Sequence, residues 1–324
     1  MQERSSQEVN PMNKAMYKYR FSIFTATYNR ASDLEKLSEF ILNQTFKGGY
    51  EWVIVSDGST DNTDQIVDKI KSSTDIPIKY ISKDNGGKHT AWRAAMPIME
   101  GQYVITCDDD DPVELNLLEE FDKQWSLLEE SSSYDSFWEI RARCKYEDGR
   151  LVGPELGEPY FDTSYIDLAY KHNYIAEMIS CRKIEVLRTI ASVPENFLFE
   201  DKCSNFPESV RWACASRKYK SRVIPAVLCT YVIGHESLCT TTKRTVKKDY
   251  NSLVSSLYCI KEVGDCLLKY RPKQYLRMII LLAYSSIRAK ENIFRHITRP
   301  IDKMTYVLFY LPAYILFAIK NNIK

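Results

Sequence analysis

Histidine and paired cysteines are scarce in this chain of 324 residues. It has four histidines, and its nine cysteines are scattered without a C-x-x-C pair or a close Cys/His pair. This argues against a zinc-rich chain and is typical of reduced thiols in a cytosolic protein. The net charge of +1 argues against a nucleic-acid-binding surface. The glycine-rich loops of nicotinamide enzymes (G-x-G-x-x-G) and ATPases (G-x-x-x-x-G-K-[ST]) are absent as well.

Long apolar runs are also missing, with one partial exception near the end of the chain. Met304 to Ile319 is apolar and aromatic, but Pro312 interrupts its sixteen residues, and a membrane-spanning helix needs roughly 20. Residues 261–324 carry a net charge of +8, whereas 1–260 carry −7. A basic, aromatic-rich segment favours a helix over about 304–320 that lies on the anionic cytoplasmic face of a membrane. The alternative is an ordinary helix packed on its own domain.

The first half of the chain alternates between strand and helix patterns. Strands are expected over 21–28, 52–56, 76–82 and 103–107, and helices over 33–44, 61–73 and 89–99. This alternation predicts an α/β fold with a doubly wound, mostly parallel sheet. Ligands of such sheets bind beyond the carboxyl ends of the strands. The loops that begin after Thr27, Ser56, Ser82 and Cys107 should therefore carry the chemistry.

Four consecutive aspartates, Asp108 to Asp111, follow the last of these strands. Carboxylates this close repel one another and raise each other's pKa unless a cation neutralises them, so the cluster predicts a divalent metal held by oxygen ligands. Asp108 and Asp110 form a D-x-D, and residues two apart can converge on one ion while Asp109 points away. The alternative is a solvated acidic turn in which Asp111 caps a helix that starts at Val113.

The other three loops are polar too, and none of their motifs is decisive alone. They read Thr27-Tyr28-Asn29-Arg30, Asp57-Gly58-Ser59-Thr60-Asp61 and Asp84-Asn85-Gly86-Gly87-Lys88-His89. An acid after the second strand can accept hydrogen bonds from a base or a ribose. The glycine pair, with Lys88 and Arg93, offers close backbone approach and positive charge for phosphate. The alternative for the Asp57 tract is an Asx turn that opens a helix.

Taken in order, the tracts FTATYNR, VIVSDGSTDNT, NGGKHTAWR and ITCDDDD resemble the nucleotide-sugar half of family 2 glycosyltransferases with the GT-A fold. The resemblance continues through FDTSYIDLAYK, FPESVRW and KYKSRVI, and is greatest to the bacterial branch that builds surface polysaccharides. It implies inverting hexosyl transfer from a nucleoside diphosphate sugar, with a UDP-sugar expected, assisted by Mg²⁺ or Mn²⁺. The implied domain covers residues 20–242, with a nucleotide-sugar half (20–112) and an acceptor half (113–242). A flexible extension (1–19) precedes it, and a helical region (243–324) follows.

The resemblance also assigns roles to individual residues. Asp57 would hold the uracil, Asp108 would approach the ribose or the sugar, and Asp110 would bind the metal, with His235 near the metal or the diphosphate. The remaining members of the nucleotide-sugar set are Thr27, Asn29, Arg30, Lys88, Arg93 and Asp109.

An inverting transfer also needs a carboxylate base in the second half of the domain. Family members often carry it as an acid before a helix with an aromatic residue following, which Glu208 and Trp212 match. The more common Glu-Asp form of the motif matches Glu200-Asp201, so Asp201 is the second candidate. Helix capping also favours an acid such as Glu208 in a first turn. Glu177 lies where related sequences carry an acidic segment facing the acceptor.

The acceptor and the partners follow from the same reasoning. We expect the acceptor to be a glycan or a lipid-linked molecule. We also expect the protein to lie in the cytoplasm, in contact with the membrane surface, and not to bind nucleic acid. The competing function is that of a sugar-phosphate nucleotidyltransferase, which has a related fold. Those enzymes use a glycine-rich loop after the first strand, whereas this chain has no glycine before Gly48.

Overall fold

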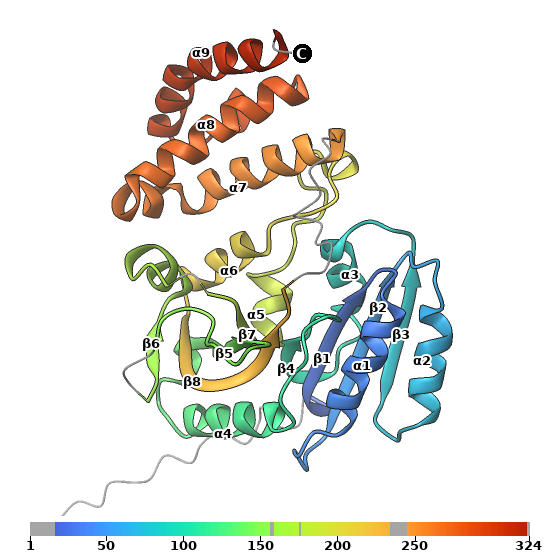
Figure 1. Ribbon diagram of the computed structural model, residues 1–324. Coiled ribbons are helices and arrows are strands. Elements are labelled where there is room, and N and C mark those ends of the chain that lie inside the picture. The colour runs from blue at the N-terminus through green and yellow to red at the C-terminus, as the bar shows by residue number, and fades with distance from the viewer. Residues whose placement is uncertain (1–16, 156–158, 175, 234–244, 323–324) are drawn as a thin grey trace, which may run out of the picture.

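The computed structural model describes residues 17–155, 159–174, 176–233 and 245–322. These form one eight-stranded sheet with helices on both faces, and a stack of helices beyond one end (Figure 1). The strands are β1 (Tyr19–Thr27), β2 (Tyr50–Asp57), β3 (Ile78–Lys83), β4 (Gly101–Thr106), β5 (Phe137–Tyr146), β6 (Phe161–Thr163), β7 (Met178–Lys183) and β8 (Lys220–Tyr231). The helices of the sheet domain are α1 (Ala31–Leu42), α2 (Thr63–Ser72), α3 (Lys88–Ala95), α4 (Leu117–Glu129), α5 (Ile184–Thr189) and α6 (Glu208–Ser216).

The first half is the predicted parallel unit. Strands β3, β2, β1 and β4 lie side by side in that order, and every pairing among them is parallel. The apolar side chains of β1, β2 and β4 are buried on both faces, as parallel strands require, whereas those of the edge strand β3 are half-buried. Apolar faces of α1, α2 and α4 pack on one side of the sheet, and those of α3, α5 and α6 on the other. The predicted α/β class and the four strands are confirmed.

The second half continues the same sheet in mixed directions. Strand β7 inserts between β4 and β5 and is antiparallel to both, β5 and β8 are parallel, and β6 forms the antiparallel edge. The antiparallel pairing of β4 with β7 joins the two halves directly. Side chains at the end of β4 therefore lie beside those that enter β7.

The helix after the acid cluster starts later than Val113, where one of the two alternatives drawn from the sequence placed its first residue. It begins at Leu117 with Asn116 as its N-cap, so Asp111 is not the cap of a helix from Val113. The intervening segment is held against β8 instead, since Val113 bridges to Cys229 and the Asp111 carboxylate accepts a hydrogen bond from the Val232 amide at 3.1 Å. Asp111 is thereby turned toward the second half of the domain.

Three helices follow the sheet domain: α7 (Val246–Tyr270), α8 (Pro272–Ala289) and α9 (Pro300–Asn322). The helical C-terminal region expected from the sequence is present as these helices. The three are stacked one upon the next above α6 (Figure 1) and share an apolar core separate from that of the sheet. Helix α9 continues through Pro312, and Pro300–Ile319 is long and apolar enough to cross a membrane by length and composition.

Trp125 provides a test of how α4 is held on the sheet. Its indole is fully buried, stacks on Tyr103 at 4.2 Å between ring centroids, and lies against Cys181. We expect Trp125→Ala to lower the free energy of unfolding by about 3–5 kcal/mol, because it empties a closed site in the core. Urea unfolding measures the loss. Leu127→Ala, on the same helix but 52% exposed, should stay within about 0.5 kcal/mol of the parent, and equal losses would contradict the packing.

Candidate active site

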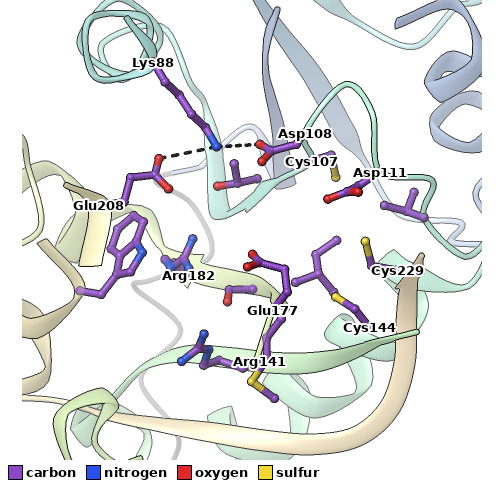
Figure 2. Close-up of a pocket in the computed structure, with 16 residues that line it drawn as sticks. Lys88, Cys107, Asp108, Asp111, Arg141, Cys144, Glu177, Arg182, Glu208 and Cys229 are labelled. Carbon is purple, nitrogen blue, oxygen red and sulfur yellow. Dashed lines mark hydrogen bonds and ion pairs between the residues drawn. The ribbon is translucent and has the colours of Figure 1, made fainter. Parts of the chain in front are cut away.

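A pocket of about 110 Å³ opens where β4 ends beside β7 (Figure 2). We call it the Asp108 pocket. Asp108 and Asp111 come from the segment after β4, Lys88 begins α3, Glu208 begins α6, and Glu177 precedes β7. The rest of the lining is Thr106, Cys107, Val113, Arg141, Cys144, Met178, Ile179, Ser180, Arg182, Trp212 and Cys229. The pocket thus collects charged groups from both halves of the sheet over a partly apolar floor.

Lys88 connects the two halves at the mouth of this pocket. Its ammonium lies 2.7 Å from Asp108 and 3.8 Å from Glu208 (Figure 2). Burial disfavours the charged lysine, but the two carboxylates outweigh it and raise the pKa of Lys88 above its usual range. The side chain is therefore held as a cation, placed between an acid of the first half of the sheet domain and an acid of the second half.

Glu208 is held in place by one of its two oxygens. Oε1 accepts hydrogen bonds from the indole N–H of Trp92 at 3.0 Å and from Arg211 at 3.2 Å. Burial alone would raise the pKa of Glu208, but Lys88, Arg211 and the Trp92 hydrogen bond lower it to about 2. Glu208 is accordingly ionised near neutral pH, and it faces the pocket as a carboxylate.

Asp201, the second candidate base, lies elsewhere. It is exposed, in a short 3₁₀ turn (Glu200–Lys202), and does not line the Asp108 pocket. The neighbouring Glu200 pairs with Arg93, which also donates to the Pro194 carbonyl. Arg93, expected near the base and phosphates, is thus drawn toward the segment that precedes α6. Of the two candidate acids, the structure brings Glu208 together with Asp108.

The other members of the acid cluster face Arg30. Its guanidinium pairs with Asp109 at 3.1 Å and with Asp110. Asp109 is buried, and burial raises its pKa to about 6, although Thr27 and Arg30 counteract the shift. Asp109 and Asp110 line a second, larger cavity of about 450 Å³. The acid cluster therefore separates two cavities, with Asp108 and Asp111 on one and Asp109 and Asp110 on the other.

The fit of these residues to a metal ion is partial. Within the four described ranges, no group of three or more His, Cys, Asp or Glu side chains is arranged to hold an ion. Asp110 offers oxygens beside a cavity, but Arg30 now occupies one of them. His235, the second predicted ligand, lies outside the described residues. An ion at Asp110 would need further oxygen donors from outside this set, such as a bound diphosphate.

The loops after β1, β2 and β3 are tied together around Asp57. Its carboxylate accepts hydrogen bonds from Lys83 at 2.6 Å and from the backbone amides of Gly86 and Gly87 at 3.0 and 2.7 Å. These contacts outweigh burial and lower the pKa of Asp57. Asn29 joins the loops after β1 and β2 by accepting a hydrogen bond from the Thr60 amide at 2.7 Å. Asp57 thus orders the Gly-Gly turn that leads to Lys88.

Sequence reasoning missed several residues of this site. Arg141 and Arg182 line the Asp108 pocket from β5 and β7, and Arg182 lies 3.9 Å from the ring of Trp212. Arg211, whose side chain is 2% exposed, was missed as a partner of Glu208. Isolated arginines in strands and helices carry no motif. One available signal was the spacing of Glu208 and Arg211, three residues apart on one helix, which places them on one face.

Comparisons with known proteins relate the first half of the chain to glycosyltransferases. Residues 22–140 match the family model "Glycosyl transferase family 2". Glycosyltransferase GlyA of Streptococcus pneumoniae is 27% identical over 48% of this chain, and poly(ribitol-phosphate) beta-N-acetylglucosaminyltransferase TarS of Staphylococcus aureus is 30% identical over 31%. The matches cover 21% and 18% of those proteins, so the chain spans about a fifth of the length of these curated relatives.

Solved structures extend the likeness beyond the matched segment. TarS residues 1–349 in complex with UDP-GlcNAc superimposes with a TM-score of 0.58 at 16% identity, over 91% of this chain and 81% of that one. Mannosyltransferase PcManGT of Pyrobaculum calidifontis, in complex with GDP-Man and Mn²⁺, gives 0.50 at 15% identity, over 95% and 81%. The fold is therefore GT-A, and residues 22–140 of this chain are similar to bacterial members of glycosyltransferase family 2.

Gly87 provides a test of the turn that presents Lys88. It has a φ of +93°, and a Cβ added there would collide with the Ser204 carbonyl oxygen. We expect Gly87→Ala to cost about 2–5 kcal/mol of unfolding free energy, from left-handed strain plus the clash. The matched control is Gly149→Ala, with a φ of +83° but open space around it, which should cost about 1–2 kcal/mol. Equal losses in urea unfolding would show that the turn does not pack on Ser204.

Proposed function

We propose that this glycosyltransferase transfers a sugar, with inversion, from a nucleoside diphosphate sugar to a glycan or lipid-linked acceptor in bacterial surface polysaccharide synthesis. One observation carries the proposal. Glu208 and Asp108, from opposite halves of the sheet, line one pocket and share the cation of Lys88 between them. The pocket thus has an ionised acid on the acceptor side and a separate acid on the donor side.

In the proposed reaction, the acceptor hydroxyl oxygen attacks the anomeric carbon of the donor sugar. Its proton passes to Glu208, and the bond from that carbon to the diphosphate oxygen breaks on the opposite face. Trp92 and Arg211 both hold Oε1, so Oε2 is the oxygen we assign to take the proton. A carboxylate with a pKa near 2 is a weak base. When the donor binds, the Lys88 ammonium would move from Glu208 to the diphosphate. The loss of this neighbouring charge would raise the pKa of Glu208 toward the pH at which the enzyme works.

We assign the diphosphate to the acid cluster and its cations. A Mg²⁺ or Mn²⁺ ion at Asp110 would offset the charge that develops on the leaving group. Arg30, which now pairs with Asp110, would have to yield that oxygen or share it. The PcManGT complex with GDP-Man and Mn²⁺ supports such an ion in this fold.

A uridine donor is the expectation that the comparisons support best. Solved TarS structures contain UDP and UDP-GlcNAc. For this chain we propose that Asp57 and the Gly-Gly turn border the nucleoside, with Thr27 and Asn29 lining the same loops. We place the reaction in the cytoplasm, near the face of the cell membrane.

Donor hydrolysis without an acceptor tests the reaction class. The protein is incubated with a panel of UDP-sugars and Mn²⁺, and we expect slow release of UDP from one or a few of them. Exchange of labelled pyrophosphate into UTP would instead indicate a sugar-phosphate nucleotidyltransferase. Absence of both, with no thermal shift by any nucleotide, would contradict the proposal.

The catalytic base is tested by paired substitutions. Glu208→Gln should lower kcat for transfer by about 10²–10⁴-fold, because the amide cannot take the acceptor proton, while the KM for the donor changes little. Asp201→Asn, a matched change at an exposed acid outside the pocket, should keep kcat within about twofold. The reverse pattern would assign the base to Asp201.

The metal assignment is tested at Asp110. We expect EDTA to abolish transfer and Mn²⁺ to restore it, and Asp110→Asn to raise the Mn²⁺ concentration for half-maximal activity by about tenfold or more. Asp33→Asn is the control, because Asp33 lines the same second cavity on α1. Full activity in EDTA would rule out the metal.

A further inference from the structure

Helix α9 has an outward face made of large apolar side chains. Met304, Leu308, Leu311 and Ile315 recur at helical spacing along one stripe, and their side chains are 70%, 70%, 64% and 51% exposed. Exposed apolar patches of this extent mark contact surfaces rather than ordinary protein surface. The free chain therefore leaves a face uncovered that is unfavourable in water.

The inward face of the same helix is committed to α8. Asp302 accepts a hydrogen bond from Tyr275 at 2.7 Å, Tyr306 bonds Ser286 at 2.9 Å, and the Phe317 ring lies 6.3 Å from that of Tyr284. A helix crossing a bilayer alone would have to break these contacts and expose the core of the stack. Although α9 is long enough to span a membrane, its packing favours a position flat on the surface, with one face in protein and one in lipid.

Positive charge lies just before α9 in the chain and in its first turn. The segment that leads into α9 carries the exposed Lys290 and Arg295, with Phe294 also exposed, and Lys303 in the first turn of α9 lies 5.5 Å from the Phe294 ring. With the net charge of +8 over residues 261–324, this matches an anionic lipid surface. Basic side chains would meet the headgroups while the stripe enters the acyl boundary.

We propose that the outward face of α9 docks in the plane of an anionic membrane surface. The docking would attach the enzyme without a spanning segment in the described chain. The surface lies at the far end of the helical stack from the sheet (Figure 1), so docking leaves the Asp108 pocket open to the cytoplasm.

The stack also sets how far the pocket is from the lipid, a step that rests on the proposed function. Glu208 begins α6, and α7, α8 and α9 follow in succession (Figure 1). Three interhelix spacings of about 8–10 Å each place Glu208 roughly 25 Å from the axis of α9. An acceptor anchored in the same membrane must reach that far. It is therefore a lipid-linked glycan of several sugars, rather than a lipid whose first sugar lies at the headgroups.

Vesicle co-sedimentation of the full chain tests the docking. We expect binding to vesicles of phosphatidylcholine with 30% phosphatidylglycerol to exceed binding to phosphatidylcholine alone by about tenfold, and to weaken as salt is raised. The double variant Leu308→Glu/Leu311→Glu should lose at least tenfold of this binding. Leu127→Glu, at a leucine on α4 that is 52% exposed, should bind as the parent does. Donor hydrolysis should be unchanged in all variants, because neither site borders the pocket.

Two results would overturn the docking. Equal binding of parent and α9 double variant to anionic vesicles would exclude this face. A concentration-dependent dimer of the parent in light scattering, abolished by the double variant and without vesicle binding, would assign the face to a second copy. The double variant Lys290→Gln/Arg295→Gln should show a smaller preference for anionic vesicles but still bind them through the apolar face. An unchanged preference would show that these two basic residues do not contribute to the docking.

The distance is tested separately from the docking and from the reaction. Two acceptors are made from the sugar that the enzyme is found to glycosylate. In each, the sugar is joined to an alkyl anchor by a polyethylene glycol spacer, one shorter and one longer than about 25 Å. On vesicles, the long-spacer acceptor should be used at least fivefold faster, whereas in detergent both should be used equally. If the two acceptors are used at equal rates on vesicles, the inferred distance between the pocket and the lipid is wrong, but the docking is not affected. If neither acceptor is used in detergent, the proposed function is contradicted instead.

Discussion

The site depends on one cation between two acids. Lys88 lies 2.7 Å from Asp108 and 3.8 Å from Glu208, and these acids belong to the two halves of the sheet domain that the pairing of β4 with β7 joins directly. Without the lysine, the two carboxylates would face each other across a small pocket and repel. Its placement in turn requires the Gly86-Gly87 turn, which the buried Asp57 orders through two backbone amides.

The Glu208 side of the pocket has its own electrostatic arrangement. Arg211 is buried between the indoles of Trp92 and Trp212, and Glu208 is the acid it contacts. Burial lowers the pKa of Arg211 to about 10 even with that partner. Removing either charge of a buried pair is costly, because the other is left uncompensated. The pair thus fixes the position of Glu208 at the start of α6, and the indole N–H of Trp92 completes the restraint.

Much of the fold was accessible from sequence. Strands β1 to β4 are short apolar runs between amphipathic helices, and this alternation alone predicts a parallel, doubly wound unit. The directions of β5 to β8 were not predictable, because an antiparallel insertion such as β7 leaves the same apolar pattern as a parallel strand. The start of α4 was missed since Val113 bridges to β8, a contact between distant segments that overrides the local capping signal of Asp111.

By itself, the sequence indicated the class of protein and predicted which acids of the first half would lie together, because loops that follow parallel strands must converge at one edge of the sheet. Only the tertiary structure decided how those acids are shared. In it, Asp108 pairs with Lys88 and Asp110 pairs with Arg30. Asp201 is exposed, whereas Glu208 lines the pocket. It also decided which face of α9 is free, because that depends on which side packs on α8. Pairings of this kind arise from packing between remote segments, which no local pattern encodes.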